Sequence, residues 1–251
     1  MRDSTVVDDA PIGVSPPASG GWSIGETIEI LLKRRSLFFE RVASDPRITR
    51  EVPTLLTIAF LAAMPVGAIL GSYAGGWHIL YVALKVPLLL LLSLTICYLG
   101  FWVSALYVGL DLLPGQVATL CVGSMAITAI VLLGLAPLLW LVIPSQTSET
   151  SYHLIALTLV AIFGVAGLVG TWQLIRGLRV LAAPSQHSRR AGVCTLALGW
   201  IALYAVVGSQ LAWVLRPWLL HPWTRGGLPF IRDLDISIFE AVWRIVGRLI
   251  G

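Results

Sequence analysis

Four residues of this chain have side chains of the kind that bind metal ions or haem iron: His78, His153, His221 and Glu149. Imidazole nitrogens and carboxylate oxygens are common ligands of zinc, copper and iron. The three histidines lie on different segments, so their spacing does not define a site, and polar residues at the rim of an apolar domain occur without any ligand. The four residues are weak candidates for a metal or haem site, and we expect no cofactor.

The three cysteines, Cys97, Cys121 and Cys194, are separated by 24 and 73 residues, which matches no metal or redox spacing. We interpret them as buried thiols that act as small apolar side chains. The sequence contains no nucleophile elbow, phosphate-binding loop, paired carboxylates or His-Glu-x-x-His pattern. We therefore expect no catalytic residues and a protein that is not an enzyme.

The composition indicates a membrane protein. Of the 251 residues 57% are hydrophobic and 12% are charged, whereas soluble domains have about a quarter charged residues. Between residues 52 and 215 the charged residues are Lys85, Asp111, Glu149, Arg176, Arg179, Arg189 and Arg190. The formal charge of +4 comes from basic residues that flank apolar segments, so binding of nucleic acid is not expected.

Five apolar stretches are long enough to cross a bilayer, which takes about 20 helical residues. They cover residues 54–73, 84–106, 117–143, 153–175 and 193–215. Lys85 is expected at the entry of the second stretch, from where its flexible stem can reach the headgroups. Because the stretches are continuously apolar and do not alternate, the predicted fold class is all-α, a polytopic membrane helical bundle with amphipathic helices at both ends.

Basic residues predict the orientation. Six Lys or Arg lie between residues 33 and 50 and four more between the fourth and fifth stretches, whereas the loops 74–79 and 144–152 contain none. The positive-inside rule then places the N-terminus in the cytoplasm and the C-terminus outside, and tryptophan positions agree. We expect the bacterial inner (cytoplasmic) membrane, with the C-terminus in the periplasm or the extracellular space.

The ends of the chain frame the membrane domain, residues 52–215. Residues 1–22 are Pro-rich and polar, which predicts a flexible cytoplasmic tail. In residues 23–51, Ser23 and Glu26 have capping-box spacing and start an amphipathic helix and linker. We expect this helix to lie on the inner leaflet, with a soluble connector as the alternative. Residues 216–251 form an extracytoplasmic extension, in which Ser237 and Glu240 start a second amphipathic helix.

Small residues form two stripes in the predicted spans. Ala63, Gly67, Gly71 and Gly75 recur at intervals of four, and Gly164, Gly167 and Gly170 at intervals of three. Small residues allow a second helix backbone to come close. The stripes predict either internal packing of the bundle, which we favour, or docking of another membrane subunit.

Residues 208–218, GSQLAWVLRPW, hold a spaced pattern, G-x-Q-x-x-W-x-x-R-P, made by Gly208, Gln210, Trp213, Arg216 and Pro217. It resembles a signature of uncharacterised bacterial polytopic membrane proteins, loosely similar to the Yip1-like group of five-span proteins. In that signature a Phe/Arg pair and a short aromatic helix follow, and Phe230, Arg232 and Phe239 fit this continuation. The resemblance implies no defined reaction.

Within this segment we expect Gln210, Trp213, Arg216 and Arg232 to act as structural anchors or as partner contacts. A glutamine about two turns from the end of a span needs a hydrogen-bonding partner in the bundle, and Arg216 followed by Pro217 suits the end of a helix.

Almost no charge is expected inside the membrane, where transport proteins usually carry ionisable groups. The sequence thus predicts a non-catalytic accessory, scaffolding or assembly subunit of a bacterial membrane complex. Its expected partners are the lipid bilayer and other membrane subunits or further copies of itself. The alternatives are a channel or carrier formed on oligomerisation, and a metal- or haem-handling protein that uses the outer histidines.

Overall fold

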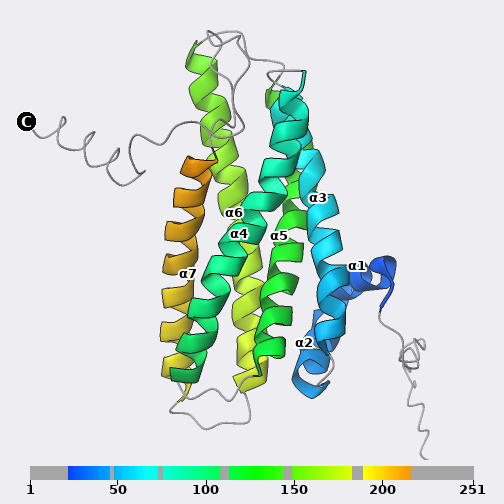
Figure 1. Ribbon diagram of the computed structural model, residues 1–251, viewed down its shortest axis with the longest axis vertical. Coiled ribbons are helices and arrows are strands. Elements are labelled where there is room, and N and C mark those ends of the chain that lie inside the picture. Colours follow the sequence, from blue (N-terminus) through cyan, green and yellow to red (C-terminus); the bar gives the residue numbers. More distant parts are fainter. Residues whose placement is uncertain are drawn as a thin grey trace, which may run out of the picture.

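Five long helices stand side by side, with two short helices beside the lower part of α3 (Figure 1). The computed structural model describes residues 22–45, 48–72, 76–107, 113–143, 149–182 and 189–215, and for residues 149–156, 182 and 189–197 it describes the backbone alone. All regular structure in these ranges is helical, as expected. The long helices are α3 (Val52–Ser72), α4 (His78–Tyr107), α5 (Pro114–Val142), α6 (Glu149–Ala182) and α7 (Arg189–Val214).

Four helical segments are long and apolar enough to cross a membrane: Ile48–Ser72, His78–Tyr107, Pro114–Val142 and Leu157–Leu181. They confirm the first four predicted stretches. The fifth stretch is also helical, but the apolar part that the structure describes there, Leu198–Val214, is shorter.

The contact between α3 and α4 depends on two glycines of the predicted stripe. A Cβ atom built on Gly67 would lie 2.6 Å from Ala83 Cα, and one built on Gly71 would lie 2.6 Å from Ile79 Cα. Only a residue without a side chain allows the two backbones to approach so closely. For these two residues the prediction of internal packing is confirmed.

From α3, helix α4 runs diagonally across the bundle to α7 (Figure 1). At that end the rings of Phe101 and Trp200 lie 4.5 Å apart between centroids at an angle of 60°, and Trp200 contacts Tyr204 in turn. Tilted aromatic contacts of this kind are favourable beyond the area that they bury. They attach α7 to the bundle through α4.

The short helices α1 (Ile24–Lys33) and α2 (Arg35–Ser44) meet at Arg34 and form a hairpin. A 3-10 turn, η1 (Ile48–Glu51), then leads into α3. Ser23 caps α1: its hydroxyl accepts from the Glu26 amide at 3.3 Å, and its own amide donates to the Glu26 carboxylate at 2.9 Å. The predicted capping box is therefore confirmed.

The hairpin packs on the bundle through phenylalanine rings that sit over glycines. A Cβ on Gly123 of α5 would lie 2.7 Å from the Phe38 ring, and one on Gly177 of α6 would lie 2.9 Å from the Phe39 ring. Leu31, Phe38, Phe39 and Val42 are all at most 5% exposed. The expectation of one helix was wrong, since residues 24–44 form two helices, and the bundle covers part of their apolar surface.

A buried carboxylate holds the start of the hairpin. The backbone amide of Trp22 donates to both Glu51 carboxylate oxygens at 3.2 and 3.3 Å, and Glu51 is 3% exposed. The Arg41 guanidinium lies 4.5 Å from the centroid of the Trp22 ring, a cation–π contact, and Trp22 also contacts Phe38. These contacts join α1, α2 and the start of α3.

Contacts along α5 give the helix directions near the hairpin. Gln116 donates its side-chain amide to Ala43 O at 3.3 Å, and Gly123 lies further along α5 against Phe38, so α2 runs antiparallel to α5. Helix α6 is also antiparallel to α5, because Gly177 packs on Leu120 and Gly170 packs on Ser124 and Thr128. Helices α2 and α6 consequently run in the same direction.

The α3–α4 contact predicts opposite effects for two glycine substitutions. Gly67→Ala should lower the free energy of unfolding in detergent by about 1–3 kcal/mol, because the added methyl group meets backbone atoms of α4 that cannot move independently. Gly134→Ala should be neutral or slightly stabilising, because nothing lies within 4 Å of a Cβ at Gly134. Equal effects of the two substitutions would contradict the close α3–α4 approach.

The capping box predicts a pH dependence at the start of α1. Hydrogen bonds from the Ser23 amide and then from its hydroxyl lower the pKa of Glu26 from its ordinary 4.5. Since the folded pKa lies below the unfolded one, the box stabilises α1 fully above about pH 4.5 and loses its contribution as the pH falls through the lowered pKa. Hydrogen-exchange protection factors for the first turn of α1 should fall over that range. Glu26→Gln, whose side chain does not ionise, should show no such fall, and an identical pH profile in both proteins would refute the assignment.

Candidate functional site

Helix α6 presents an open face on the outside of the bundle. Leu157, Val160 and Leu168 on this face are 67–69% exposed. A Cβ built on Gly164 or Gly167 would meet nothing within 4 Å. In the most apolar segment of α6, 28% of the residues are buried, against 44–50% in the corresponding segments of the other three candidate spans. We call Leu157, Val160, Gly164, Gly167 and Leu168 the open face of α6.

The predicted stripe of α6 is divided between two surfaces. A Cβ built on Gly170 would lie 3.0 Å from Ser124 O, so this glycine belongs to the internal contact with α5. Gly164 and Gly167 do not take part in such a contact. Internal packing was expected for the whole stripe. It is found at Gly170 but not at Gly164 and Gly167. In the stripe that begins in α3, Gly75 lies outside the described residues.

Lys85 is buried, which the sequence analysis did not anticipate. The side chain is 1% exposed and interacts with another group of the chain. Because α4 begins at His78 and not near residue 84, Lys85 lies about two turns inside the helix. The expectation of a side chain that extends to the surface was wrong, because the bundle covers Lys85.

Gln173 of α6 is the second unexpected polar residue. It is 2% exposed, and neither its amide nitrogen nor its amide oxygen has a hydrogen-bonding partner. Gly170 and Gly177, one turn away on either side, both pack on α5, so Gln173 belongs to the inner side of α6. A carboxamide here can donate and accept one or more hydrogen bonds to a polar group that enters the bundle.

A signal for Gln173 was present in the sequence. Gln173 is the only strongly polar uncharged residue in the apolar part of the fourth stretch. It lies at helical spacing between Gly170 and Gly177. Small neighbours of this kind mark the inner face of a membrane helix. Gln210 is the more conspicuous glutamine in the sequence, because it lies within the spaced pattern near the end of the fifth stretch.

Two of the cysteines fit the interpretation as apolar side chains. Cys97 and Cys121 are unpaired thiols with 0% exposure in the hydrophobic core. The side chain of Cys194 lies outside the described residues.

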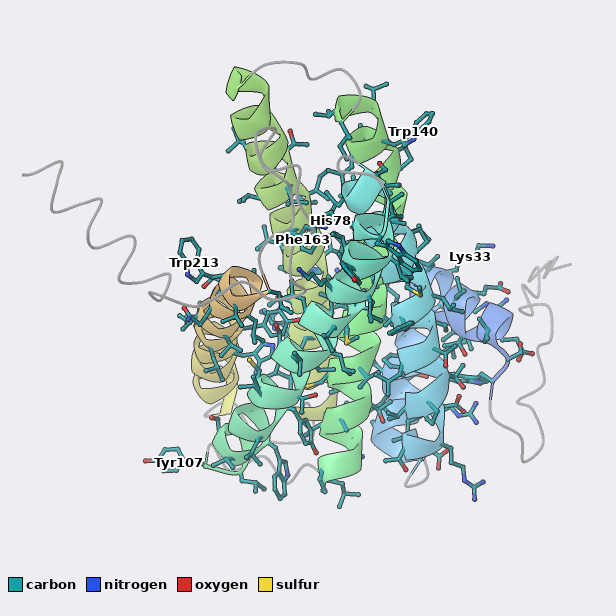
Figure 2. The ribbon with its side chains drawn as sticks, turned by 45° about the horizontal axis from the view of Figure 1, so that its top comes forward. Lys33, His78, Tyr107, Trp140, Phe163 and Trp213 are labelled. Carbon is teal, nitrogen blue, oxygen red and sulfur yellow. The ribbon has the colours of Figure 1, made fainter. Side chains whose placement is uncertain are left out.

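The structure does not bring the candidate ligands together in the part that it describes. His78 begins α4, is 9% exposed and interacts with another group; Figure 2 shows it near Phe163 in this view. Glu149 and His153 belong to the first turns of α6, where only the backbone is described, and His221 lies outside the described residues. Within the described ranges no group of three or more His, Cys, Asp or Glu residues is placed to hold a metal ion.

The C-terminal pattern is described only in part. Gln210 and Trp213 lie in the last turns of α7, are partly buried and interact with other groups. Gly208 faces α4, since its Cβ would lie 3.9 Å from Ser93 Oγ. The predicted anchors Arg216 and Arg232 and the second capping box lie outside the described residues, so their roles stay predictions.

Comparisons with protein-family models, with curated proteins and with solved structures give no match for this chain. The functional argument therefore rests on the residues and their arrangement alone.

The unpartnered amide predicts a gain of stability on its removal. Gln173→Leu should raise the free energy of unfolding in detergent by about 1–3 kcal/mol, because a side chain of similar size replaces a buried group without partners. Gln116→Leu is the matched control. It should lower the stability, because Gln116 donates to Ala43 O at 3.3 Å and accepts from the Leu113 amide at 3.2 Å. A loss of stability in both variants would show that Gln173 has a partner.

Proposed function

We propose that this protein is a non-catalytic accessory, scaffolding or assembly subunit of a bacterial membrane complex. The observation that carries the proposal is the open face of α6, where Gly164 and Gly167 have no neighbour while large apolar side chains around them are exposed. The proposed partner contact is a membrane helix of another subunit, or of a second copy, packed along this face.

Lipid alone is a poorer explanation for the open glycines. Lipid chains are as apolar as leucine, so a lipid-facing surface gains nothing from residues that lack a side chain, whereas an approaching helix does. The chain uses this device internally, at Gly67 and Gly71 against α4 and at Gly170 against α5. The same device on the outside of α6 suits a helix that comes from another chain.

The proposed topology has five spans in the bacterial inner membrane, with α7 as the fifth span, the N-terminus in the cytoplasm and the C-terminus outside. Exposed Arg176 and Arg179 near the end of α6 support it, because basic residues collect on the cytoplasmic side. Trp140 and Tyr107, at opposite ends of the bundle, suit the two interfacial belts (Figure 2).

A channel or carrier is the second candidate, and buried polar groups favour it. Lys85 and Gln173 are at most 2% exposed in helices that are apolar enough to span a membrane. A charge at the bilayer centre costs about 2.5–3.5 kcal/mol or more, and such residues often mark a pathway for a solute. In this reading Gln173 would bind a polar group of the solute by hydrogen bonds, and Lys85 would be a second polar point on its path.

Substitution of the open glycines tests the first proposal. The full chain is purified from its native membrane in mild detergent. A cross-linking group at residue 160, on the open face, captures the partner, and mass spectrometry identifies partners present in stoichiometric amounts. Gly164→Leu with Gly167→Leu should reduce the recovered partner, or the second copy, at least about tenfold, because leucine side chains separate the two backbones. Gly134→Leu, at an equally open glycine of α5, should leave recovery unchanged.

The outcome that contradicts the accessory role is a chain that stays alone and transports solute. If the purified monomer moves anions into liposomes, and Lys85→Met abolishes the flux while the leucine variants do not change it, the carrier reading replaces the first proposal.

A further inference from the structure

The turn between α1 and α2 carries three consecutive basic residues. Lys33 ends α1, Arg34 has φ −120° and ψ 50° at the junction, and Arg35 begins α2. Lys33 projects from the hairpin on the side away from the bundle (Figure 2). We call Lys33, Arg34 and Arg35 the basic elbow.

The charge of the basic elbow is not neutralised within the described part of the chain. The ion pair found there joins Arg41 to Asp45 at 3.9 Å and involves no residue of the elbow. Glu29 precedes Lys33 by four residues, the spacing of a helical ion pair, yet no such pair forms. The Nε atom of Arg35 is buried and has no hydrogen-bonding partner. The elbow can therefore attract and bind an anionic group.

The level of the elbow along the bundle follows from its neighbour α6. Phe39 of α2 packs on Gly177 of α6, and the two helices run in the same direction. Arg35 lies one turn before Phe39, and Trp172 lies just over one turn before Gly177, so the elbow is about level with Trp172. Trp172 is 54% exposed, and the Arg176 guanidinium lies 5.4 Å from its ring centroid. An exposed tryptophan beside an arginine is typical of the headgroup region of a membrane.

Apolar side chains flank the elbow. Leu32 is 42% exposed and Leu37 is 45% exposed, whereas Leu31, Phe38 and Phe39 beside them are buried against the bundle. A basic cluster between exposed leucines combines attraction to anionic headgroups with a place for the apolar part of the lipid. A purely water-facing elbow would gain nothing from the two leucines.

We propose that the basic elbow, together with Leu32 and Leu37, is a docking surface for the headgroups of acidic phospholipids in the leaflet beside α6. The lipid phosphate binds the guanidinium groups of Arg34 and Arg35 and the Lys33 ammonium, and Leu32 and Leu37 contact the acyl chains. The bundle covers one face of the hairpin and the lipid covers another. This inference does not depend on the accessory role, because it concerns the lipid and not the open face of α6.

Lipid retention by the full chain tests the docking surface. The protein is placed in nanodiscs of phosphatidylcholine with a graded fraction of phosphatidylglycerol, and bound lipid is measured by native mass spectrometry after release. The native chain should retain phosphatidylglycerol over phosphatidylcholine. Lys33→Gln with Arg34→Gln should lower that preference about tenfold or more, because two of the three cations that bind the phosphate are lost, each worth on the order of fivefold.

Three further double variants separate charge, position and folding. Arg50→Gln with Arg179→Gln removes the same charge from two exposed residues outside the elbow and should change the preference less than twofold. Lys33→Arg with Arg34→Lys keeps the charge and should keep the preference. Leu32→Gln with Leu37→Gln should weaken lipid retention while all basic residues remain, which tests the surface without altering the elbow itself.

Three results would overturn the proposal. One is an equal loss in the elbow variant and in the Arg50/Arg179 control, which would mean that only net charge matters. Another is an unchanged preference in a correctly folded elbow variant. The third is a full chain without preference for phosphatidylglycerol that gains the preference when residues 1–21 are deleted. Asp3, Asp8 and Asp9 of that segment would then be the occupants of the elbow.

Discussion

The close approach of helix backbones at glycine residues is the contact on which the rest of this structure depends. In lipid there is little hydrophobic gain from pressing one apolar helix on another, so the association relies on short-range packing. Gly67 and Gly71 bring α3 against the first turns of α4, and this contact starts α4 on its diagonal course to α7. The hairpin uses a related contact, in which the rings of Phe38 and Phe39 occupy the space over Gly123 and Gly177. One type of contact thus assembles the bundle and attaches the hairpin to it.

Polar groups inside this bundle are treated in two different ways. The Glu51 carboxylate accepts from the Trp22 amide, so its burial fixes where the hairpin begins. Gln173 has no such partner, although it is as deeply buried. A buried amide without partners costs stability, and a chain that keeps one either tolerates that cost or uses the amide for a group that enters the bundle. Gln173 and Lys85 are the residues that link the fold to the transport alternative.

Most of the helices could be predicted from the sequence, because continuous apolar stretches and a lack of charge depend only on local composition. The start of α4 was missed, since Lys85 was taken as the border of the apolar stretch, whereas the helix continues through residues 79–84 back to His78. That difference alone moves Lys85 from the surface to the interior. The hairpin was missed for another reason. Its apolar residues have helical spacing throughout, and the break at Arg34 follows from the positions of Gly123 and Gly177, which are distant in sequence.

Helical geometry also explains why Gly67 and Gly71 share one contact whereas the other predicted stripe is divided. Each residue turns the helix by about 100°, so residues at intervals of four drift by about 40° per step, and Gly67 and Gly71 stay on one face. Intervals of three drift by about 60° per step in the opposite sense, so Gly164 and Gly170 lie about 120° apart. Gly170 then faces α5 while Gly164 points away from it, as their different surroundings show. The same helix can therefore pack inside its own bundle and still present small residues to a second protein. The spacing that makes the stripe imperfect is what gives α6 two usable faces.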